Sequence, residues 1–114
     1  MQPILKAGFH SEMTAARQAY ENHAWKTAFY HLERAHILGQ RYFWPHLQTH
    51  LWMFRFGLKR RDVKEITGQS LRILAVFPAA LFNWVPEGNT GGANISAIKT
   101  LPIPTDLQKL LDSE

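Results

Sequence analysis

The fold is decided by the stretch Trp25-Lys-Thr-Ala-Phe-Tyr-His-Leu-Glu-Arg-Ala-His-Ile-Leu-Gly39 and by the segment that follows it, Pro45-His-Leu-Gln-Thr-His-Leu51. In the first segment, large side chains recur at helical spacing and form one face, which consists of Trp25, Phe29, Leu32 and His36. Gly39 is placed to end this helix, and Pro45 suits the first turn of the next one. The short connection predicts two antiparallel helices with histidines on facing sides.

Helical periodicity also occurs on both sides of this stretch. Ser11 followed by Glu12 predicts the start of a first helix, and Asn22 can cap the second helix. Asp62-Val-Lys-Glu65 has the spacing of a capping box for a fourth helix, which Pro78 kinks or ends. The expected buried face of that helix comprises Val63, Ile66, Ile73, Leu74 and Phe77.

After Trp84 the helical periodicity stops for about twenty residues, which is a long stretch for a compact domain. Interspersed Ile and Leu residues argue against disorder, so we expect an ordered segment laid across the helices. A short last helix should begin at Thr105. The sequence therefore predicts one all-α domain over residues 1–114: an antiparallel four-helix bundle-like domain with an ordered irregular C-terminal segment and a short terminal helix.

The composition excludes several classes of protein. The chain has no cysteine, which excludes disulfides, thiolate metal sites and cysteine nucleophiles. Its hydrophobic content of 46% with 19% charged residues is that of a globular protein. No window has the roughly 18 apolar residues of a membrane span, and the N-terminus lacks the features of a signal peptide. We therefore expect a cytoplasmic protein that does not enter a membrane.

The histidines form the one constellation that could support chemistry. His46 and His50 are four residues apart on one helix face, and Glu33 and His36 are three residues apart on the neighbouring helix. An antiparallel pair would bring these four side chains together around a divalent metal ion such as zinc, copper or iron. His31 points some 140° away from His36 around an ideal helix and is not part of this set.

The same histidines have a purely structural interpretation. A histidine on an apolar helix face usually packs there and donates a hydrogen bond to a carbonyl or carboxylate. His36 could bond a carbonyl of the glycine-rich segment and so fix that segment to the helices. The spacing alone favours this structural lock over a metal site, and no other cofactor is expected.

The segment Gly88-Asn-Thr-Gly-Gly-Ala-Asn94 is a second candidate site. Adjacent glycines let successive amides form a nest for an anion, so Asn89, Thr90, Gly91 and Gly92 are candidate ligand-binding residues. The spacing is neither that of a phosphate-binding loop nor that of a dinucleotide fingerprint. A tight turn that requires positive φ is the simpler interpretation.

A third candidate is the basic cluster formed by Arg55, Lys59, Arg60 and Arg61. Together with a net charge of +4, it could contact phosphates in a salt-dependent, sequence-independent way. The chain carries no recognisable nucleic-acid-binding module, so a solvated junction between two helices is the favoured interpretation and a nucleic-acid partner is not expected.

Aromatic residues surround most of the third expected helix: Trp44, Trp52, Phe54 and Phe56. Some of them must be exposed unless another surface covers them, and exposed aromatic area often marks an interface between subunits. We therefore expect a homodimer, or another protein partner, although the C-terminal segment could cover the same surface within one chain.

With His31-Leu-Glu-Arg-Ala-His-Ile-Leu-Gly-Gln40, Arg60-Arg-Asp62, Gly88-Asn-Thr-Gly-Gly-Ala-Asn94 and Pro102-Ile-Pro104, the chain resembles DUF3703, a small bacterial family of unknown function. The resemblance implies a short, stand-alone bacterial protein of cytoplasmic type, with no catalytic residues to carry over. It also implies that the histidine helix and the glycine-rich segment belong together. The first expectation is a non-enzymatic binding module that acts as a homo-oligomer. The alternatives are a metal-binding helical protein and, more weakly, a basic nucleic-acid accessory protein.

Overall fold

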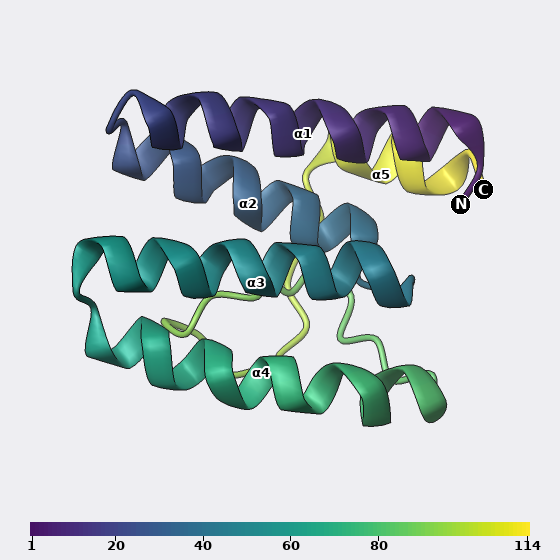
Figure 1. Cartoon of the computed structure of the whole chain (residues 1–114). Helices are drawn as coiled ribbons and strands as arrows, with labels where there is room; N and C mark the ends of the chain where they lie inside the picture. Colours follow the sequence, from purple (N-terminus) through teal and green to yellow (C-terminus); the bar gives the residue numbers. More distant parts are fainter.

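A computed structural model describes all residues from 1 to 114 and confirms the all-α class. It contains five helices and no strand, and the four long helices form a compact globule (Figure 1). The helices are α1 (Pro3–Glu21), α2 (Trp25–Gly39), α3 (Phe43–Arg60), α4 (Val63–Leu81) and α5 (Thr105–Asp112).

The four long helices pack in chain order, α1 on α2, α2 on α3 and α3 on α4 (Figure 1). The outer helices α1 and α4 therefore lie at opposite edges of the domain. The segment between α4 and α5 returns across the helices and delivers α5 to a position against α1 and α2. The two ends of the chain meet there, because the backbone amide of Gln2 donates to a Glu114 carboxylate oxygen at 2.8 Å.

Two helix starts differ from the sequence-based prediction. α1 begins at Pro3 rather than Ser11, because a proline fits the first turn, where its missing N–H has no helical partner. Ser11 lies inside this helix. Asn22 forms the C-terminal cap of α1, and Ala24 precedes the first residue of α2. Gly39 ends α2 as predicted, whereas α3 continues past Gly57 to Arg60.

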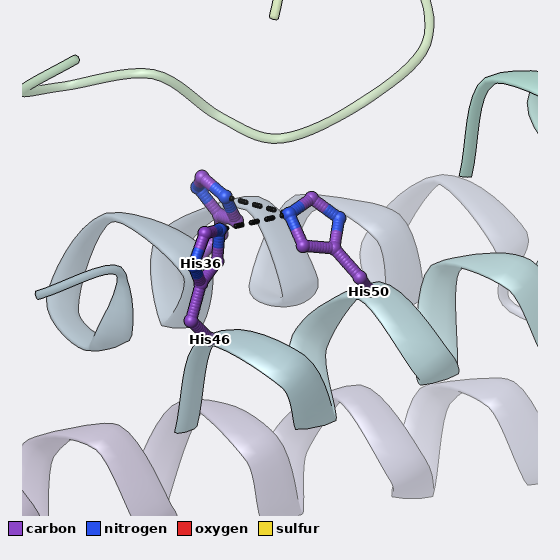
Figure 2. Close-up of side chains that lie close together, drawn as sticks. All are labelled: His36, His46 and His50. Carbon is purple, nitrogen blue, oxygen red and sulfur yellow. Dashed lines mark hydrogen bonds between the residues drawn. The ribbon is translucent and has the colours of Figure 1, made fainter. Parts of the chain in front are cut away.

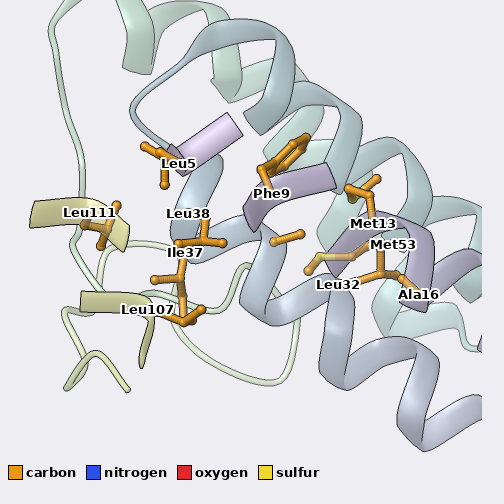
Figure 3. Packing of buried hydrophobic residues seen from close by; sticks show 11 residues of the cluster. Leu5, Phe9, Met13, Ala16, Leu32, Ile37, Leu38, Met53, Leu107 and Leu111 are labelled. Carbon is orange, nitrogen blue, oxygen red and sulfur yellow. The ribbon is translucent and has the colours of Figure 1, made fainter. Parts of the chain in front are cut away.

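The hydrophobic core lies between α1, α2 and α5 and receives one side chain from α3 (Figure 3). Ala28 and Ala35 are fully buried, and their small side chains let α2 approach its neighbours closely, as the sequence predicted. The core cluster consists of Leu5, Phe9, Met13, Ala16, Leu32, Ala35, Ile37, Leu38, Met53, Leu107 and Leu111.

The predicted buried face of α4 is wrong at three of its five positions, since only Ile66 and Ile73 are partly buried. Val63, Leu74 and Phe77 are 71%, 75% and 66% exposed, whereas Gln69 is fully buried. The buried residues of α4 are Glu65, Gln69 and Val76, and the first two face the irregular segment through hydrogen bonds. The helix thus packs by polar pairing and leaves its most apolar side chains outside. It also continues through Pro78 to Leu81 rather than ending there.

The capping box at the start of α4 forms only in part. The Asp62 side chain accepts from the Glu65 amide at 3.1 Å, as a cap does. The Glu65 carboxylate does not return this bond. It accepts instead from Gln69 Nε2 at 2.6 Å and from the Ala93 amide at 3.0 Å. Glu65 therefore ties the irregular segment to α4.

Asn89 organises the irregular segment from within. Its side chain is 2% exposed, donates to the carbonyls of Ser96 and Lys99 at 2.9 and 2.7 Å, and accepts from the Gly91 amide at 2.9 Å. Gly88 precedes it with φ +76°, and a Cβ there would lie 1.8 Å from the Leu101 carbonyl oxygen. The segment is therefore ordered, as its sequence predicted, and Asn89 is its centre.

Asn89→Ala should destabilise the protein by roughly 2–4 kcal/mol, because it removes three hydrogen bonds and leaves buried backbone groups without partners. Denaturant unfolding measures the loss. Asn94→Ala is the matched control, since Asn94 is exposed, and it should stay within about 0.5 kcal/mol of the wild type. Equal effects of the two substitutions would contradict this role of Asn89.

Candidate metal centre

Three histidines converge where α2 and α3 face each other (Figure 2). His46 and His50 are one turn apart on α3, and His36 faces them from α2. His36 Nε2 lies 3.2 Å from His50 Nε2, and His50 Nε2 lies 3.0 Å from His46 Nε2. One nitrogen from each ring falls within 4.8 Å of the others. The helical spacing predicted this convergence of His36, His46 and His50.

Hydrogen bonds on the far side of two rings determine where their protons sit. His36 Nδ1 lies 2.6 Å from the Asn89 carbonyl oxygen, which can only accept, so Nδ1 carries the proton. His50 Nδ1 lies 2.6 Å from Gln69 Oε1. Gln69 Nε2 donates to Glu65 at 2.6 Å and to the Gly91 carbonyl at 2.8 Å, which fixes the orientation of the amide. His50 therefore also carries its proton on Nδ1.

The Nε2 atoms of His36 and His50 are consequently both unprotonated, and their lone pairs meet at 3.2 Å. Such a contact is repulsive unless a positive charge or a donor lies between the two atoms. His46 can offer one N–H, and His50 is its nearest acceptor at 3.0 Å. For a tetrahedral zinc ion with Zn–N bonds of about 2.0–2.1 Å, neighbouring ligand nitrogens are about 3.3 Å apart. The separations of His50 Nε2 from His36 Nε2 and from His46 Nε2, 3.2 and 3.0 Å, are close to that of metal ligands.

All three imidazoles are neutral at ordinary pH. Burial lowers the pKa of His46 from 6.5 to about 4, and burial together with the neighbouring His46 lowers the pKa of His50 to about 3. Burial and the charges of His50 and His46 hold the pKa of His36 well below 6.5. Neutral imidazole is the form that binds metal, so protons compete weakly at this site.

Glu33, the fourth candidate ligand, lies outside this cluster. Burial raises the pKa of its carboxyl group, and the neighbouring Thr90 side chain partly offsets this rise. The position that the sequence reasoning missed is Gln69, which orients His50 and contacts the irregular segment at the same time. A glutamine in the middle of an apolar helix was the one available signal for it.

A cavity of about 280 Å³ adjoins the three histidines. Most of its wall is apolar and comes from the second half of α4 and from the irregular segment. Phe82, Trp84 and Ile98 line the cavity and are themselves 78%, 56% and 61% exposed, so its mouth lies at the protein surface. The histidines thus lie at one end of an apolar pocket rather than in a sealed core.

The glycine-rich candidate site is occupied by the chain's own contacts. Among Asn89, Thr90, Gly91 and Gly92, the Asn89 carbonyl accepts from His36 and the Gly91 carbonyl accepts from Gln69. The Gly91 amide donates to the Asn89 side chain. Gly91 has φ +83°, and a Cβ there would lie 2.5 Å from the His36 ring. This glycine permits the close approach of the segment to the histidine cluster.

The structure gathers the candidate basic residues at the end of α3 and at its cap. Arg55 stacks over Trp52 and Arg60 over Trp25, with 4.8 and 5.1 Å from the guanidinium carbon to the ring centre. Lys59 and Arg61 are exposed. Two of the four side chains in the basic cluster therefore also cover aromatic rings.

The aromatic residues of α3 are more enclosed than we expected. Trp52, Phe54 and Phe56 are half-buried, and Phe56 packs against Phe29 with ring centres 4.9 Å apart. Trp44 remains 70% exposed. The larger exposed apolar surface lies on α4, where the sequence predicted a buried face.

No helix of the structure has both the length and the apolar character needed to cross a membrane. Among known families, the model described as "Protein of unknown function (DUF3703)" matches residues 4–111. No curated protein and no solved structure matches the chain.

The metal-free protein should lose stability as the pH falls from about 6.5 toward 4. In this window the unfolded chain protonates its histidines while the folded cluster stays neutral, so the unfolded state binds more protons. Each such histidine lowers the free energy of unfolding by up to about 1.4 kcal/mol per pH unit. Urea unfolding at several pH values measures the slope.

His46→Asn should make this slope shallower, because it removes one of the three histidines that stay neutral when folded. His10→Asn is the control, since His10 is exposed on α1 and should leave the slope unchanged. If the free energy of unfolding of His46→Asn depended on pH as steeply as that of the wild type, this result would contradict the neutral state assigned to the cluster.

Proposed function

We propose that the chain, which belongs to the DUF3703 family of unknown function, binds one divalent transition-metal ion through His36, His46 and His50. The observation that carries the proposal is the meeting of two unprotonated Nε2 atoms at 3.2 Å, with a third imidazole nitrogen 3.0 Å away. Imidazoles that hold a metal normally donate their other N–H to a carbonyl. His36 and His50 do so here.

We take zinc as the test ion among those that fit the ligand set. Imidazole nitrogen suits zinc, copper and iron, and the cluster contains no thiolate or carboxylate that would favour another ion. Structural zinc sites have four protein ligands, whereas catalytic or ligand-binding sites have three and keep one position open. Three histidines beside a cavity correspond to the second arrangement, with the open position toward the cavity.

Tag-free protein, freed of metal with a chelator, should bind one equivalent of Zn²⁺ in calorimetric titration. Because the metal binds only the folded state, free zinc at a hundredfold excess over Kd should stabilise the protein by about 2.7 kcal/mol. His46→Ala should abolish both effects. His46 is the suitable position, since its side chain is half-buried and its ring nitrogens bond no group outside the cluster.

His10→Ala should bind zinc as the wild type does, because His10 is exposed and remote from the cluster. The proposal is contradicted if the wild type binds no zinc, copper or iron. Equal zinc binding by His46→Ala and the wild type would contradict it as well.

We also propose that the protein is a homodimer through an exposed apolar stripe at the end of α4. Its side chains are 56% to 78% exposed and consist of Leu71, Leu74, Phe77, Leu81, Phe82 and Trp84. Residues 73–86 include no charged side chain. Monomeric proteins rarely leave a contiguous apolar surface of this kind uncovered.

A second copy is the partner that suits this stripe. A charged partner would find no complementary charge on it, whereas the same stripe on a second chain is equally apolar and can pair about a two-fold axis. A standard interface needs about 800 Å² from each partner, which six large exposed side chains can supply.

The cytoplasmic location expected from the sequence and the bacterial origin implied by the family resemblance stay predictions.

Sedimentation velocity should show a dimer for the wild type and a monomer for Leu74→Glu, because a buried glutamate without a partner destabilises the interface. Ile4→Glu is the matched control: Ile4 is 61% exposed on α1, at the opposite edge of the domain, and this variant should remain dimeric. A monomeric wild type at high concentration, or wild-type binding to lipid vesicles in place of self-association, would contradict the dimer.

A further inference from the structure

The lining of the metal centre and its cavity carries positive charge and no acidic side chain. Three neutral imidazoles leave the charge of a bound divalent ion uncompensated. Arg72 lines the same cavity and adds another positive charge, which is felt at His36 and His50. The one carboxylate whose charge acts on Arg72 is that of Glu65, which lies outside the lining and already accepts from Gln69 and Ala93.

Arg72 also has an unused hydrogen-bond donor. Its Nη1 donates to the Gly68 carbonyl at 3.0 Å, and its Nη2 donates to the Ile95 carbonyl at 2.8 Å. Its Nε is buried and is the one buried side-chain polar atom of the protein without a hydrogen-bond partner. Buried donors are nearly always paired. This N–H is covered by the chain itself, so the part of Arg72 that acts on a molecule in the cavity is the charge of its guanidinium group.

Most of the remaining wall of the cavity is apolar, and Gln40 and Asn89 are its other polar lining residues. The apolar part includes Ala75, Val76, Ala79, Phe82, Trp84 and Ile98. A cavity of about 150 Å³ can hold benzene. The volume of about 280 Å³ here is sufficient for an aromatic or branched aliphatic body together with a small polar head. Positive charge at one end and apolar walls around the rest select against polar and cationic molecules.

We propose that the metal-loaded protein binds a small organic carboxylate with an apolar body. The carboxylate takes the open position of the metal ion and is attracted by the charge of Arg72, and the apolar body fills the cavity between α4 and the irregular segment. This inference rests on the proposed metal site and goes beyond it, because it assigns a ligand class to the cavity.

Benzoate is the probe, and benzamide is the neutral control of the same shape. Titration of benzoate into zinc-loaded protein should give saturable binding in calorimetry, and titration into cobalt-loaded protein should change the visible spectrum of the metal. Benzamide should bind at least roughly tenfold more weakly, because it lacks the charge. Acetate should also bind more weakly, since it lacks the apolar body.

Arg72→Met should weaken benzoate binding by roughly tenfold or more and retain one equivalent of zinc, because it removes the positive charge and keeps the length of the side chain. Ala79→Trp tests the cavity independently, since it fills the apolar wall and leaves all three histidines in the chain. This variant should lose benzoate binding and keep zinc binding.

The outcomes separate the two proposals. Absence of zinc, copper and iron binding would overturn both of them. Stoichiometric zinc binding without benzoate binding would overturn the proposed carboxylate ligand and leave the proposed metal site unaffected. Equal benzoate affinity of the zinc-loaded and metal-free proteins, or of Arg72→Met and the wild type, would also overturn the ligand while the metal site stands.

Discussion

The structure depends on the attachment of the irregular segment between α4 and α5 to the long helices. Two hydrogen bonds carry this attachment at its centre, from His36 to the Asn89 carbonyl and from Gln69 to the Gly91 carbonyl. Because these carbonyls can only accept, the bond to Asn89 fixes the proton of His36, and Gln69 passes the same constraint to His50. The segment thereby leaves both Nε2 atoms unprotonated and facing each other.

The same attachment explains why α4 turns a polar face inward. Gln69 is fully buried and Glu65 nearly so, and each bonds both the helix and the segment. A buried polar network is stable only when its donors and acceptors are matched, so the orientation of α4 is fixed by these partners rather than by its apolar residues. The apolar stripe from Leu71 to Trp84 remains exposed as a consequence. Only its last two members, Phe82 and Trp84, line the cavity.

The sequence predicted what depends on local spacing. Helical geometry and a short connection determine three features: the end of α2 at Gly39, the cap of α4 at Asp62, and the convergence of His36, His46 and His50. It could not predict what depends on contacts between distant parts of the chain. Residues 73–81 of α4 include no polar side chain, so periodicity could not identify the buried face of this half of the helix. The irregular segment determines that face, and it follows in the chain. Glu33 has the right spacing from His36, yet its carboxyl group neighbours the Thr90 side chain of that segment.

The central claim is that His36 and His50 present unprotonated Nε2 atoms because their Nδ1 protons are held elsewhere. Long-range ¹H–¹⁵N correlation spectra of the metal-free protein at neutral pH test this directly, since they distinguish the two tautomers and the imidazolium ion. The account predicts a protonated Nδ1 and an unprotonated Nε2 for both residues. An Nε2–H tautomer or a charged imidazolium at His36 or His50 would contradict it.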